Sequence, residues 1–153
     1  CIFVARMKKI LVAYDGSSHS KEALDWATDL SLMSEALVIA VKVVEPLEVG
    51  QAHAMYEAGF GKTLIEQLTN REAADKQLLQ DAIDFGRQKG VTVTTDLLQG
   101  NIAATLLEYA KDKKVDLIVA GTKGHGVLEV LLMGSVTRNL VSLAHIPVLV
   151  VKD

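Results

Sequence analysis

The sequence predicts one α/β domain built on a doubly wound parallel sheet, and three observations support that prediction. Short apolar runs of strand length alternate with longer segments in which apolar residues recur every three or four positions. Alternating strands and helices are joined by right-handed crossovers, which make the strands parallel. The 153 residues, half of them apolar, suffice for one buried core. We therefore predict a five-stranded sheet in the order 3-2-1-4-5, with helices on both faces.

The first predicted strand spans residues 9–14 and ends in the turn Asp15-Gly16-Ser17. A helix follows, with Ser18 or Ser20 expected as its N-cap. Apolar residues at helical spacing predict its buried stripe: Ala23, Trp26, Ala27, Leu30 and Met33. The second predicted strand covers residues 36–44 and is stopped by Pro46.

Residues 47–61 contain three glycines and no clean period, so we expect a mobile connection with at most one helical turn. Residues 63–89 then predict a long helix. Its expected apolar face is Leu64, Leu68, Leu78, Ala82 and Phe85.

The second half of the chain predicts three strands and two helices in alternation. The expected strands are residues 91–97, 115–120 and 147–151, and the expected helices are residues 101–113 and 135–144. We interpret residues 7–153 as a single domain and residues 1–6 as an extra segment, because Met7-Lys8-Lys9 has the pattern of a natural start.

Composition narrows the classes of partner. A formal net charge of -3 argues against a broad basic surface for nucleic acid or an anionic membrane. No apolar run approaches the roughly 18–20 residues of a membrane span. The single Cys1 cannot form an internal disulfide, which fits either a reducing compartment or a chain that is indifferent to redox state. We expect a soluble, cytoplasmic protein without a metal cage, because the four histidines share no metal-ligand spacing.

Ligands of such sheets bind where the strand order reverses, at the carboxyl ends of the first and fourth strands. Glycines follow the fourth strand at Gly121 and Gly124, and Gly134-Ser135 precedes the last helix. Glycine lets backbone approach a bulky anion, and the amides and dipole at a helix start attract phosphate. Taken alone, the glycines are better explained by a glycine turn followed by an ordinary helix cap, because glycine-rich turns after parallel strands are common.

The pattern Gly-x2-Gly-x9-Gly-Ser, running from Gly121 through Gly124 to Gly134-Ser135, resembles the nucleotide-binding signature of the universal stress protein family. The resemblance extends from Lys8 over nearly the whole chain, through an opening Ile-Leu-Val-Ala-Tyr-Asp-Gly-Ser and a closing Ile-Pro-Val-Leu-Val-Val. It implies a Rossmann-like, adenine nucleotide alpha hydrolase-like fold and the ATP-binding branch of the family. Mg²⁺ can accompany ATP phosphates because it needs few protein ligands.

The resemblance also implies a set of site residues. Asp15 would lie on the adenine or ribose side, Val43 against adenine, and Gly124 at the ribose and phosphates. The complete implied set is Ala13, Tyr14, Asp15, Val43, Ala120, Gly121, Gly124, Gly134, Ser135, Val136 and Thr137. Tyr14 departs from the smaller residue often found at its position.

Two functions follow from this interpretation. The first is an ATP-binding stress-response or signalling module, and the alternative is a slow ATPase or another nucleotide-dependent enzyme. The residues define no catalytic base or water-positioning group, so we expect hydrolysis to be slow at most. The last strand, Pro147 to Val151, is apolar and predicted to lie at a sheet edge, which favours a homodimer through that edge. The family resemblance implies the same dimer.

Overall fold

The computed structural model describes residues 2, 6–122 and 133–152. Its five parallel strands lie in the order β3-β2-β1-β4-β5, which confirms the predicted sheet. The strands are β1 (Lys9–Ala13), β2 (Leu37–Val44), β3 (Val93–Gln99), β4 (Leu117–Gly121) and β5 (Val148–Val151). The helices are α2 (Ser18–Ser34), α3 (Val49–Met55), the π-helix η1 (Tyr56–Phe60), α4 (Gly61–Gln88), α5 (Ile102–Asp112) and α6 (Ser135–Leu143).

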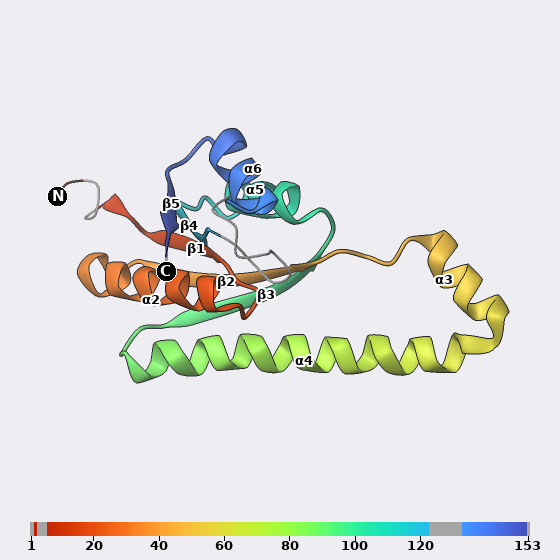
Figure 1. Ribbon diagram of the computed structural model, residues 1–153. Coiled ribbons are helices and arrows are strands. Elements are labelled where there is room, and N and C mark those ends of the chain that lie inside the picture. The colour runs from red at the N-terminus through yellow and green to blue at the C-terminus, as the bar shows by residue number, and fades with distance from the viewer. Residues whose placement is uncertain (1, 3–5, 123–132, 153) are drawn as a thin grey trace.

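Helices cover both faces of the sheet (Figure 1). Side chains alternate between faces along a strand, so neighbouring residues of β1 enter different cores. Ile10 and Val12 are buried on the face covered by α2 and α4. Leu11 is buried on the other face, beneath α5 and α6. Strands buried on both faces explain the nearly continuous apolar runs of the sequence.

Helix α2 rests on the sheet through small side chains. Its N-cap is Ser17, rather than Ser18 or Ser20, and the Ser17 hydroxyl accepts from the Ser20 amide. Ala23 and Ala27 are buried as predicted, but Trp26 is 52% exposed and Met33 is 72% exposed. The prediction for those two large residues was wrong. Their places are taken by residues that let the helix approach the strands: Ser20, Leu24, Thr28 and Ser31.

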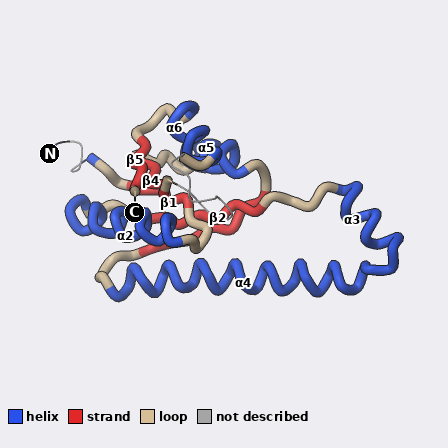
Figure 2. Tube along the Cα trace, viewed as in Figure 1, coloured by secondary structure: helices blue, strands red, loops and turns tan. Residues whose placement is uncertain are grey.

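The connection after β2 is helical over residues 49–60, which is more helix than the single turn considered from the sequence. Residues 49–60 form α3 and η1, and Gly59 makes the corner before α4 with a φ of 86°. Figure 2 shows α3 far from the sheet, at the end of a loop that leaves β2. We call residues 49–74, which comprise α3, η1 and the first half of α4, the arm. No helix of the described residues has the length and apolar character to cross a membrane.

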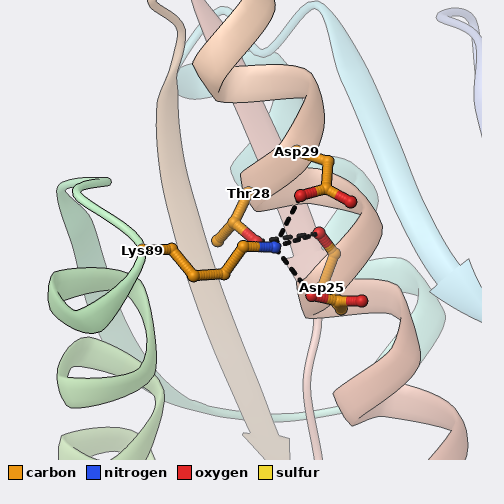
Figure 3. A network of polar contacts seen from close by, with 4 residues as sticks. All are labelled: Asp25, Thr28, Asp29 and Lys89. Atoms are coloured by element: carbon orange, nitrogen blue, oxygen red, sulfur yellow. Dashed lines mark hydrogen bonds and ion pairs between the residues drawn. The ribbon is translucent and has the colours of Figure 1, made fainter.

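The second half of α4 packs on the sheet and is fastened by ion pairs. Lys42 of β2 contacts the buried carboxylate of Asp75 at 2.6 Å. At the other end, the Lys89 ammonium reaches Asp25 at 2.7 Å and Asp29 at 2.6 Å, both on α2 (Figure 3). It also donates to the Asp25 carbonyl, and its pKa is raised because the hydrogen bonds and charges of the two aspartates outweigh the opposing effect of burial.

The third strand begins two residues later than predicted. Val91 donates its amide to the carbonyl of Gly86 at 2.8 Å, which closes the end of α4 before β3 starts at Val93. Gly86 itself permits this approach, since a Cβ there would lie 2.3 Å from a methyl of Val93.

Candidate functional site

A cavity of about 290 Å³ opens at the carboxyl ends of β1 and β4. This is where the strand order reverses, the place at which doubly wound sheets bind ligands. Ten of the eleven predicted site residues line it: Ala13, Tyr14, Asp15, Val43, Ala120, Gly121, Gly134, Ser135, Val136 and Thr137. Gly124 lies outside the described residues.

The turn after β1 is held by its own polar groups. Gly16 has a φ of 80°, a conformation that favours glycine. Asp15 Oδ1 accepts the Ser17 amide at 2.9 Å, and the Ser20 hydroxyl accepts the Asp15 amide at 3.3 Å. The Ser20 hydroxyl in turn donates to the Ser17 carbonyl. These bonds fix the position of the Asp15 carboxylate at the edge of the cavity.

The start of α6 forms the opposite side. Gly134 is the N-cap and has no side chain to occupy the first helical amides. The first helical bond runs from the Arg138 amide to the Gly134 carbonyl, so the amides of Ser135, Val136 and Thr137 precede it. Such amides, with the positive end of the helix dipole, make this wall suited to an anion.

Two of the predicted site residues, Thr137 and Gly121, also stabilise the fold itself. The Thr137 hydroxyl donates to the Gly121 carbonyl at 2.7 Å, which joins α6 to β4 and commits the hydroxyl proton. Gly121 is required by packing, because a Cβ there would lie 2.7 Å from the backbone of His19. The Thr137 amide and the Gly121 backbone still border the cavity, whereas the hydroxyl of Ser135 lies on an exposed residue.

The match of this chain to a family model decides which family it belongs to. A model of the universal stress protein family matches residues 7–152. The chain belongs to the universal stress protein family. It is 37% identical over 147 residues to Universal stress protein MJ0531 of Methanocaldococcus jannaschii, covering 95% of this chain and 82% of that protein.

Solved structures agree with this family membership. The universal stress protein UspA from Lactobacillus plantarum superposes with a TM-score of 0.80 at 25% identity, covering 96% of this chain and 99% of that one. A universal stress protein in complex with cAMP superposes with a TM-score of 0.69, also at 25% identity, covering 95% of this chain and 97% of that one.

The unusual Tyr14 leaves the apolar wall of the cavity intact. Ala13 packs on the α5–α6 face of the sheet, whereas the ring of Tyr14 is buried in the core beneath α2 and α4. Burial chiefly raises the pKa of the Tyr14 phenol, and the charges of Asp81 and Asp15 add to the effect. Strand alternation therefore turns the large ring away from the α5–α6 side of the sheet.

Five lining residues were missed by the sequence prediction: Ser20, Val41, Glu45, Ile102 and Leu106. Val41 could have been found from strand alternation, because it shares a face with Val43 two residues later. Ile102 and Leu106 share a face of α5 at a spacing of four, but nothing in the sequence says that α5 reaches the cavity. Val41, Ile102 and Leu106 together give the cavity an apolar lining in addition to the polar start of α6.

Proposed function

We propose that this universal stress protein binds ATP in the cavity at the switch point and uses the bound nucleotide to control a stress-response or signalling partner. One observation carries the proposal: a single cavity is lined both by the apolar side chains of Val41, Val43 and Leu106 and by the residues that supply the leading amides of α6. An adenine base fits the first surface and phosphates fit the second. A cytoplasmic location, which is part of this proposal, would supply the nucleotide.

The relative solved with cAMP supports an adenine nucleotide as the ligand class. Adenine, ribose and at least one phosphate are common to cAMP and ATP. Mg²⁺ would enter with the phosphates, because no group of three His, Cys, Asp or Glu side chains among the described residues can hold a metal ion. Asp15, which lines the cavity, would lie on the adenine or ribose side of the ligand.

Titration calorimetry with ATP tests the proposal. Gly134→Val should weaken ATP binding most, because a side chain at the N-cap enters the space beside the amides of α6. The Gly134 backbone has φ -59° and ψ 157°, which valine adopts without strain. Ser135→Ala should weaken binding by about 0.5–1.5 kcal/mol, the value of one hydrogen bond. Unchanged ATP affinity in folded Gly134→Val protein overturns the assignment.

Gly50→Val is the matched control. Gly50 lies in α3 on the arm, and a Cβ there meets nothing within 4 Å. It carries the same substitution away from the cavity, so ATP affinity should stay at the value of the unmodified protein. Steady ATP turnover above about 1 s⁻¹, the low end of ordinary enzyme rates, would favour the alternative function, a nucleotide-dependent enzyme, over the binding module.

We also propose that the protein forms a homodimer through β5, which lies at the sheet edge. The carbonyls of Pro147 and Val151 bond to β4, so by alternation the backbone groups of Val148 and Val150 point outward. Leu149 and Val151 pack against the core beneath α2. The outward groups, rather than those two side chains, are available to a second copy.

Val150→Pro tests the dimer. Proline removes one outward amide and is compatible with an edge strand. Sedimentation at tens of micromolar should show a dimer for the unmodified protein and a folded monomer for the variant. A dimer that survives Val150→Pro places the interface elsewhere.

A further inference from the structure

A second cavity, of about 600 Å³, opens on the same face of the sheet as the first but near the amino end of β4. It lies between the last turns of α5 and the segment that joins α6 to β5. Its volume falls in the range of about 300–1,000 Å³ in which proteins hold small molecules. None of its lining residues borders the candidate nucleotide site, so it is a separate place on the molecule.

The floor of this cavity is apolar. Ala110, Val115 and Ile118 are buried there, with Ile118 fully inaccessible. Leu107 and Ile146 form walls and are only partly buried against the same core. Leu143 stands at the mouth with 60% of its surface exposed. The exposed apolar surface of Leu143 is not covered by the described protein, so it is available for hydrophobic contact with a ligand.

The rim is cationic, although the whole chain carries a net charge of -3. Lys111, Lys114 and His145 line the cavity, against one carboxylate, that of Glu108. Neither lysine ammonium forms an ion pair with any described residue, unlike those of Lys42, Lys76 and Lys89. Two cations therefore stand beside an apolar floor without an intramolecular partner in the described chain.

A helix carboxyl end favours lysines through its dipole alone. Lys113 belongs to the same end of α5 and shares that effect, but its ammonium lies 5.8 Å from the centre of the Tyr109 ring and it does not line the cavity. The dipole accounts for lysines at this end of α5. The apolar cavity beside Lys111 and Lys114 is a separate feature, and the two together fit a ligand with one anionic end and one apolar end.

We propose that this cavity binds a small amphipathic carboxylate, with its apolar chain against Leu107, Leu143 and Ile146 and its anionic head between Lys111 and Lys114. A lysine ammonium gains most from a charged acceptor, and an apolar chain gains from covering the exposed apolar walls. The site does not depend on the proposed nucleotide function, because the two cavities share no residue.

Titration followed by amide NMR tests the site, with octanoate as the probe and octanamide as a neutral ligand of the same shape. Octanoate should bind saturably and shift the amides of Ala110 and Ile118. Octanamide should bind at least about tenfold more weakly, a difference of about 1.4 kcal/mol. Equal affinity for the two ligands, or shifts centred on Ala120 and Ser135 in the first cavity, overturns the proposal.

Matched variants locate the head and the chain of the ligand. Lys111→Gln with Lys114→Gln should weaken octanoate at least about tenfold and leave octanamide unchanged, whereas Lys113→Gln should change neither. Leu143→Ser should weaken both ligands, because it removes apolar contact at an exposed position without touching the floor. Octanoate affinity that is insensitive to the double lysine variant contradicts the proposed head site, and circular dichroism establishes that each variant is folded.

Discussion

The two halves of α4 share one continuous helix but have different surroundings. In the second half, Asp75, Leu79, Ala82 and Gly86 are buried against the sheet. None of residues 61–74, all of them described, is buried, and Ile65 is 65% exposed. Figure 1 shows the first half running past the sheet toward α3. A helical period therefore tells which residues share a face, but it does not tell where the surface that covers that face ends.

The largest expected effect comes from the ion pair that begins the packed half. Lys42→Met leaves the carboxylate of Asp75 buried without its cation, which should lower the free energy of unfolding by about 3–5 kcal/mol. Urea denaturation measures the loss. In the control, Lys76→Met breaks the exposed pair with Glu72 and should cost about 0.5 kcal/mol or less.

A compensating variant makes this prediction sharper. Replacing both partners, Lys42→Met with Asp75→Leu, should recover most of the stability, because no unpaired charge remains in the core. If Lys42→Met cost no more than Lys76→Met, the two halves of α4 would not differ in the way that their burial indicates.

The next effect compares one apolar truncation in each half. Leu79 is 5% exposed, and Leu79→Ala should lower the free energy of unfolding by about 2–5 kcal/mol through lost burial and a cavity. Ile65→Ala on the arm should change it by no more than about 0.5 kcal/mol. Equal losses in urea denaturation would show that the arm is packed in solution against a surface that one chain does not supply.

The sequence predicted the fold more completely than it predicted which helix residues are buried. Strand runs such as residues 10–13 are apolar on both faces, so the sheet and its order follow from local pattern and topology rules. Trp26 and Leu68 have the right spacing for a core face, yet both are exposed. Their burial depends on how closely the helix approaches the sheet and how far the sheet extends. Neither quantity is encoded in a local period.

The candidate site shows the same limit. The loops after β1 and before α6 could be predicted because glycines and the strand ends mark them. Ile102, Leu106 and Glu45 come from elements whose approach to the cavity is set by tertiary packing. Thr137 belongs to the site set that the resemblance implies, and its hydroxyl donates to the Gly121 carbonyl between α6 and β4.

A smaller effect is expected where α4 ends. Lys89→Met removes the two ion pairs to α2, and because the aspartates are about half exposed it should cost on the order of 1 kcal/mol. The loss should shrink in 1 M salt, which screens exposed charges. Arg87→Met, which breaks only the exposed contact with Asp84, is the control and should cost less. A loss that does not vary with salt would assign the effect to the contact of Lys89 with Phe85 instead.

The smallest effect appears only at alkaline pH. It involves Tyr14, which follows β1 and is buried in the same core as Leu79 and Ala82 of α4. Burial, followed by the charges of Asp81 and Asp15, raises the pKa of Tyr14 above its ordinary 10.0 in the folded protein. The unfolded chain then releases this proton first as pH rises. The contribution of the protonated Tyr14 phenol to stability is fully present below pH 10 and is lost as pH climbs through the folded pKa.

Tyr14→Phe should leave the free energy of unfolding at pH 7 nearly unchanged and make the decline of that free energy above pH 10 shallower in urea denaturation. Part of the decline should persist, since burial, followed by the hydrogen bond and charge of Asp96, also raises the pKa of Tyr109. Tyr56→Phe, on the exposed arm, is the matched control. The same alkaline slope in both variants would contradict a buried phenol at Tyr14.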